Sequence, residues 1–113
     1  MTRNILDKRL KSLISELAEM GSLVEKQIYD SINALKNHDV ELSEKVIKND
    51  DKVDALNKRI EEKCLIYMAT QSPMASDLRK MFAASKIVTD LERIADYAVD
   101  ICKINKRIEI DPL

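Results

Sequence analysis

The sequence predicts an all-α protein, an antiparallel up-down-up bundle of three helices in one compact domain. Three long stretches carry apolar residues at alternating spacings of three and four, the pattern of an amphipathic helix with one buried face. The 113 residues include one glycine and two prolines, too few for the frequent turns of a sheet protein. Short polar breaks separate the stretches, and such short links make neighbouring helices antiparallel.

The first predicted helix runs from about Ile5 to Lys36. Its apolar stripe continues at three- and four-residue spacing through Leu10, Leu13, Leu17, Met20, Val24, Ile28, Ile32 and Leu35. Gly21 interrupts this helix at a cost of about 1 kcal/mol relative to alanine. We expect it to allow a close helix crossing or a slight bend.

The second predicted helix follows a break at residues 37–39 and runs to about Thr70. Asp39 is suited to cap its start, because a short acceptor side chain can bond the free N–H groups of the first turn. The apolar stripe of this helix is Leu42, Val46, Val53, Leu56, Ile60, Cys64 and Tyr67.

The third predicted helix starts at a cap formed by Ser72, with Pro73 as the first helical residue. It runs to about Arg107, and we expect no helix beyond Ile108. Residues 1–108 then form the bundle, and residues 109–113 form a tail or the start of a linker. The apolar stripe of this helix is Leu78, Met81, Val88, Leu91, Ala95, Ala98 and Cys102.

Composition excludes several classes of function. With a net charge of −1, the protein lacks the basic surface of a nucleic-acid-binding protein. No apolar run approaches the ~20 residues of a membrane span, so we expect a cytoplasmic protein without membrane insertion. The single histidine, His38, lies in a turn where it cannot serve a distant nucleophile, so we expect neither an enzyme nor an organic cofactor. Cys64 and Cys102 lie too far apart along the bundle for a disulfide, and we expect reduced, buried thiols.

Two pairs of acids indicate where a metal ion could bind. Asp50 and Asp54 lie one turn apart on the second helix, and Glu92 and Asp96 lie one turn apart on the third. If the turn between these helices is centred near Ser72, the two pairs lie at the same height, with Asp90 close to them. Four converging carboxylates form an all-oxygen site suited to hard cations, and also to iron or manganese.

The alternative is that these acids form a solvated helix face. With 20 acids in 113 residues, about three acidic pairs at this spacing are expected by chance. The chain has three such pairs, the third being Asp96 and Asp100. Only the matching height of the first two pairs therefore favours a metal site.

Particular motifs resemble the PhoU family of phosphate-signalling regulators. They are NDD-x-VDAL from Asn49, SPMASDLR from Ser72 and KI-x-x-DLERIAD from Lys86, and the similarity extends over almost the whole chain. The resemblance implies a spectrin-like three-helix repeat without catalytic activity. It implies a negative regulator that acts as an adaptor between a phosphate transporter of the ABC type, through its ATPase, and a sensor histidine kinase, at the inner face of the membrane.

The resemblance also bears on metal and on assembly. Some PhoU-like proteins bind divalent ions or iron or zinc clusters through a Glu/Asp-x-x-x-Asp motif, which here falls on Asp50 and Asp54 and on Glu92 and Asp96. A typical member has two repeats and this chain has one, so it is expected to be a half of such a protein or to restore the pair as a homodimer. Two other functions stay open: a metal-binding bundle, and a purely structural interaction domain.

Overall fold

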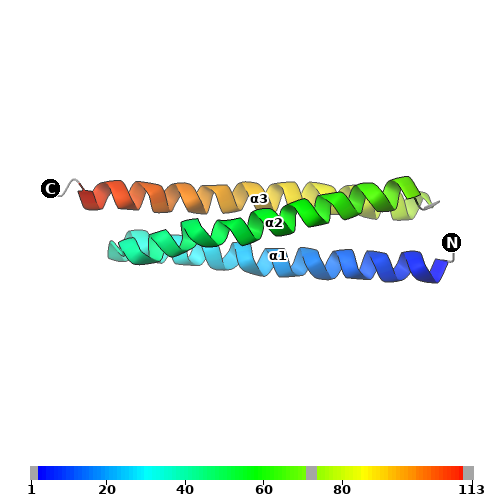
Figure 1. Ribbon diagram of the computed structural model, residues 1–113, viewed down its shortest axis with the longest axis horizontal. Helices are drawn as coiled ribbons and strands as arrows, with labels where there is room; N and C mark the ends of the chain where they lie inside the picture. The colour runs from blue at the N-terminus through cyan, green and yellow to red at the C-terminus, as the bar shows by residue number, and fades with distance from the viewer. Residues whose placement is uncertain (1–2, 71–73, 111–113) are drawn as a thin grey trace.

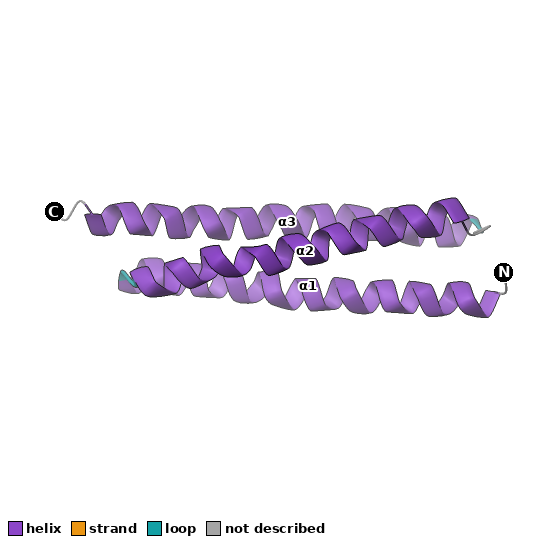
Figure 2. Cartoon of the chain, viewed as in Figure 1, coloured by secondary structure: helices purple, strands orange, loops and turns teal. Residues whose placement is uncertain are grey.

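The computed structural model describes residues 3–70 and 74–110, and almost all of them are helical (Figure 2). The three helices are α1 (Arg3–Asn37), α2 (Val40–Thr70) and α3 (Ala75–Ile110). They run up, down and up, so that the start of α1 and the end of α3 lie at opposite ends of a rod (Figure 1). The rod measures 63 × 17 × 16 Å. The predicted three-helix bundle is confirmed.

A thin core runs along the axis of the rod, with one stripe from each helix. Its largest cluster consists of Leu13, Met20, Val24, Val53, Leu56, Ile60, Cys64, Ala84, Val88 and Ala95. Smaller clusters continue the core toward both ends, one around Leu6 and Tyr67 and the other around Val46 and Cys102. Most of the stripe on α3 is made of small side chains, which lets the other two helices approach it closely.

The stripe predicted for the second half of α1 is wrong in part. Ile32 and Leu35 are exposed. The buried positions of this half are polar or small: Gln27, Ser31 and Ala34. The Ser31 hydroxyl donates to the carbonyl oxygen three residues earlier, at 2.8 Å, and so needs no partner on another helix. A search for apolar residues alone does not find this buried face, because its residues share a helical spacing but are not all apolar.

Two backbone hydrogen bonds close the turn between α1 and α2. The Asp39 N–H donates to the Ala34 carbonyl oxygen at 2.8 Å, and the His38 N–H donates to that of Leu35 at 3.4 Å. This pair of bonds is the Schellman motif, which needs a left-handed residue directly after the helix. His38 takes that conformation with a φ of 53°. Asp39 then caps α2 as predicted, accepting the Leu42 N–H on Oδ1 at 3.0 Å.

The start of α3 lies later than predicted. Ser72 and Pro73 are outside the described residues, and Met74 is not yet helical. The helix begins at Ala75, and Asp77 satisfies its first turn by accepting the Met74 N–H on Oδ2 at 3.1 Å. At the other end α3 continues through Ile110, beyond the end predicted near Arg107, and residues 111–113 are outside the described part.

The late start of α3 changes its register against α2. Two side-chain hydrogen bonds record that register, one between Asn57 and Glu92 and one between Asn105 and Ser43. The predicted register would have placed Asn57 opposite Ile87. Each residue of α3 therefore faces a residue of α2 that lies about one helical turn closer to the C-terminal end of α2 than predicted. The reason is that the connection between the two helices is centred beyond Ser72.

The left-handed turn gives a first prediction. A residue with a Cβ atom costs about 1 kcal/mol in the left-handed region, and glycine avoids that cost. His38→Gly should therefore raise the free energy of unfolding by up to about 1 kcal/mol, measured by urea denaturation. Lys36→Gly, two residues earlier and within α1, is the control and should lower it by about 1 kcal/mol. A loss of stability in His38→Gly would contradict the assignment of the turn.

Candidate functional site

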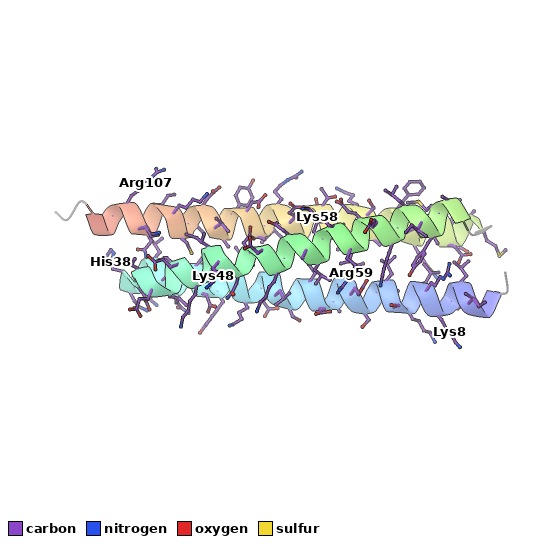
Figure 3. All side chains as sticks on the ribbon, in the orientation of Figure 1. Lys8, His38, Lys48, Lys58, Arg59 and Arg107 are labelled. Atoms are coloured by element: carbon purple, nitrogen blue, oxygen red, sulfur yellow. The ribbon has the colours of Figure 1, made fainter. Side chains whose placement is uncertain are left out.

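The four carboxylates predicted to meet lie on facing stretches of α2 and α3. They are Asp50, Asp54, Glu92 and Asp96. Lys48 and Lys58, labelled in Figure 3, bracket the stretch of α2 that carries the first two. Asp96 is exposed and the other three are half-buried, so the group lies at the rim of the α2/α3 seam and not in the core.

The pKa of Asp50 shows that these carboxylates act on one another. Burial raises the pKa of the Asp50 carboxyl above its ordinary value, and the negative charges of Asp54 and Asp96 raise it further. The hydrogen bond that Gln27 Nε2 donates to Asp50 Oδ1, at 3.3 Å, works in the opposite direction. Asp50 thus lies between a neutral donor on α1 and three like charges, the third being that of Asp51.

Glu92 has comparable surroundings on α3. Burial raises the pKa of the Glu92 carboxyl, and the charges of Asp54 and Asp96 add to the increase, followed by those of Glu61 and Asp50. The Glu92 Oε2 atom accepts a hydrogen bond from the side-chain amide of Asn57. Because Asp54 and Asp96 raise the pKa of both groups, the four carboxylates lie near enough to one another for their charges to interact, together with the neighbouring Asp51 and Glu61.

Asp90, which the sequence placed close to this group, is not part of it. Its carboxylate lies 3.5 Å from the Lys86 ammonium one turn earlier on α3. Its charge is not among the causes of the raised pKa of Asp50 or of Glu92. The altered register explains this difference, because it places Asp54 opposite residues of α3 that follow Asp90 in the sequence.

The donor chemistry of the group fits a hard cation. Carboxylates are joined by two amide carbonyl oxygens, Gln27 Oε1 and Asn57 Oδ1, which are buried and have no hydrogen-bond partner among the described residues. Calcium, magnesium and manganese ions prefer such all-oxygen ligands. As the side chains stand, no group of three or more His, Cys, Asp or Glu within residues 3–70 and 74–110 is arranged to hold a metal ion. A bound cation would therefore need carboxylate side chains to turn toward it.

Gln27 and Asn57 are the residues of this region that the sequence analysis missed. Both are buried, and each donates to one of the two carboxylates whose pKa is raised. The signal in the sequence is a polar amide at core spacing: Gln27 lies three residues after Val24, and Asn57 lies four residues after Val53. Apolar patterns ignore such positions because amides count as surface residues.

Within residues 3–70 and 74–110, neither the single histidine nor the two cysteines form a nucleophile paired with a base. His38 lies at the end of the rod where α1 meets α2 (Figure 3). Cys64 and Cys102 are free and buried, as predicted, and burial raises the pKa of both thiols. A thiol with a raised pKa is a poor nucleophile because little thiolate forms near neutral pH.

A second surface of note is an apolar groove between α1 and α3, with a volume of about 520 Å³. Its lining includes Ile14 and Ile87, both of which are exposed. Small residues widen the groove: Ala18, Gly21, Ala83 and Ala84. A Cβ atom added to Gly21 would meet nothing within 4 Å, so the close helix crossing predicted at this glycine does not occur within the chain.

Comparison with known proteins places this bundle in a family. The PhoU domain matches residues 17–104. The chain belongs to the PhoU domain family. It is 50% identical over 109 residues to the phosphate-specific transport system accessory protein PhoU homologue of Clostridium acetobutylicum. It is 39% identical over 94 residues to the accessory protein PhoU of Escherichia coli K12.

A solved structure confirms the fold. The chain is similar to the crystal structure of PhoU from Pseudomonas aeruginosa, with a TM-score of 0.88 and 38% identity, covering 90% of this chain and 49% of that one. The C. acetobutylicum match covers 96% of this chain and 50% of the relative, and the E. coli match covers 83% and 39%. The chain thus spans about half the length of these relatives or less. They are named accessory proteins, in agreement with the expectation that the PhoU domain is not an enzyme.

The shared charges give a second prediction. Asp54→Asn removes one of the two charges that raise the pKa of both Asp50 and Glu92, so both values should fall toward the ordinary range. Carboxyl carbon chemical shifts followed through a pH titration by NMR measure both groups at once. Asp90→Asn is the matched control and should move neither. A change at Asp50 without one at Glu92 would contradict the single electrostatic group.

Proposed function

We propose that this PhoU-domain protein is a regulatory accessory factor of phosphate transport. The observation that carries the proposal is 50% identity, across 96% of the chain, to a protein named as an accessory of the phosphate-specific transport system. The structure supports it because a thin bundle with long exposed helix faces offers surfaces for protein contact. The described helices also include none that is long and apolar enough to cross a bilayer.

In the finer form of this proposal the protein is an adaptor. It contacts the ATPase of a phosphate ABC transporter and a sensor histidine kinase, at the cytoplasmic face of the membrane, and represses the phosphate-starvation response when phosphate is plentiful. The faces of α1, α2 and α3 that point away from the core supply the surfaces that contact these partners. A purely structural helical domain would have no effect on that response.

The adaptor proposal predicts a change in gene expression. Deleting the gene should switch on a phosphate-starvation reporter in phosphate-rich medium, because the repressing contact is lost. Supplying this chain from a plasmid should restore repression, and supplying a core-disrupted variant, Ile60→Asp, should not. An unchanged reporter after deletion would contradict the regulatory role and favour the structural domain.

We also propose that the partner of the α1/α3 groove is a second copy of this chain. The relatives it matches are about twice as long, and a second copy supplies a helical surface of similar extent. The groove is lined mainly by apolar side chains, and burying them removes apolar area from water. Its small residues let a partner helix approach closely.

The homodimer predicts a mass. Light scattering on the purified chain should give twice the 12.9 kDa of one chain. Ile14→Glu combined with Ile87→Glu places charges in the groove and should give a folded monomer. Ile32→Glu, an equally exposed position that does not line the groove, should leave the dimer intact. A monomeric unaltered chain would refute this proposal.

A second candidate function is metal binding by the four carboxylates, and the specific observation in its favour is their mutual effect on pKa. In this proposal Asp50, Asp54, Glu92 and Asp96 hold a divalent ion, or an iron or zinc ion. A bound cation would neutralise like charges that the fold holds together. The resulting charge change at the α2/α3 seam would let metal modify a partner contact.

Metal binding predicts a fixed stoichiometry. Elemental analysis of protein purified without chelator or metal-affinity resin should find metal at a constant ratio to protein. Glu92→Ala combined with Asp96→Ala should abolish it, because half of the carboxylates are removed. Asp90→Ala, on the same helix but outside the group, should retain the full amount. Equal metal content in the double variant would rule out this site.

A further inference from the structure

A row of cations runs along the side of α3 that points straight away from the core. The inward positions of this helix alternate at spacings of four and three residues, from Asp77 through Met81 and Ala84 to Asn105. Such a stripe repeats every seven residues, and one position in each repeat lies directly opposite the core. On α3 this outer row consists of Arg79, Lys86, Arg93, Asp100 and Arg107, all of them exposed. Four of its five members are therefore cations.

The three arginines of the outer row are available to a partner. Within the part of the chain that the structure describes, the ion pairs join other side chains, and Arg79, Arg93 and Arg107 take part in none of them. Lys86, in the same row, is paired with Asp90. Successive arginines are 14 residues apart, or about 21 Å along the helix. Figure 3 shows Arg107 pointing away from the other two helices.

Large apolar side chains lie beside the outer row, on a side of the helix that is usually polar. Phe82 is 63% exposed and Tyr97 is 58% exposed. Each lies four residues from a cation of the row, so the side chains are neighbours on the helix surface. Ile104, also exposed, lies three residues before Arg107. Phenylalanine, tyrosine and arginine are enriched in protein interfaces, and tyrosine and arginine often carry much of the binding energy.

We propose that the outer row of α3, with Phe82 and Tyr97 beside it, docks an acidic α-helix of a partner protein. A second helix that lies alongside α3 meets it at the same seven-residue repeat, so acids at that repeat pair with the cations. The two aromatic side chains supply apolar anchors between these pairs. The inference rests on the proposed accessory role, which acts through protein contact, and it gives that contact one face and one partner chemistry.

The charges around the outer row favour a helix over an anionic membrane. Asp100 lies within the row, and Asp96 and Glu92 lie on the side of α3 toward the carboxylate group described above. A broad anionic surface that reached all the arginines would also meet these carboxylates, which would repel it. A helix is only about 10 Å wide and can follow the cations along the rod, with a neutral residue opposite Asp100.

Photo-crosslinking in cells that carry the full chain tests the docking face. Tyr97 is replaced by the photo-crosslinking residue p-benzoylphenylalanine, which keeps an aromatic ring at this exposed position. Irradiation should give one adduct, and mass spectrometry should locate the cross-link in an acidic helical segment of another protein. The same replacement at Tyr29, an equally exposed tyrosine on α1, is the control and should not give this adduct.

The adduct should depend on the charge of the outer row. Arg93→Glu combined with Arg107→Glu should lower its yield at least about tenfold, because attractive contacts become repulsive. Replacing the acids of the cross-linked segment by lysine should restore the yield with this variant. Lys48→Glu combined with Lys58→Glu makes the same charge change on α2 and should leave the yield unaltered. Circular dichroism through thermal unfolding verifies that both double variants are folded.

The remaining outcomes would overturn the docking face. They are a cross-link to lipid, a cross-link to a second copy of this chain, an adduct with the same yield in the Arg93→Glu/Arg107→Glu protein, and no adduct at all. The accessory role would survive any of them if deletion of the gene still switches on the phosphate-starvation reporter. A charge-dependent adduct with an unchanged reporter would instead keep the docking face and overturn the accessory role.

Discussion

The register of α3 against α2 decides which polar groups of this bundle meet. The bonds that join Asn57 to Glu92 and Asn105 to Ser43 lie far apart along the rod and record the same register. A slip by one helical turn would move every facing side chain by about 5.4 Å. Both bonds would then be lost, and a slip toward the predicted register would place the acids of α2 opposite residues 90–94 of α3. The electrostatic group therefore depends on where the turn between the helices is centred.

That register holds like charges together at a cost to the folded state. The pKa values of Asp50 and Glu92 are raised, so the native protein binds protons more tightly than the unfolded chain does. Their contribution to stability is fully present at acid pH and is lost as the pH rises through the raised pKa values. At neutral pH the burial and mutual repulsion of these charged carboxylates therefore destabilise the fold, and the hydrogen bond from Gln27 offsets part of that cost at Asp50. A bound cation, as proposed above, would offset more of it.

Much of this could be predicted from the sequence, for definite reasons. The three helices follow from apolar spacing, and the four carboxylates follow from one-turn pairs on helices that must be antiparallel. The exact register could not be predicted, because it depends on where α3 begins, and Met74 stays non-helical for reasons of local capping by Asp77. Gln27 and Asn57 were missed because each forms its hydrogen bond with a carboxylate on another helix. The prediction that Ile32 and Leu35 belong to the buried stripe was wrong, because an apolar residue can be exposed where the core uses small side chains.

We propose that the carboxylates on facing stretches of α2 and α3 bind a cation. Paramagnetic broadening of backbone amide signals by Mn²⁺ tests it most directly, since the effect falls steeply with distance from the ion. Substoichiometric Mn²⁺ should broaden signals around Asp54 and Asp96 together, with Gln27 on α1 affected next. Broadening spread over the acidic residues of the whole rod, or confined to one helix, would contradict the account.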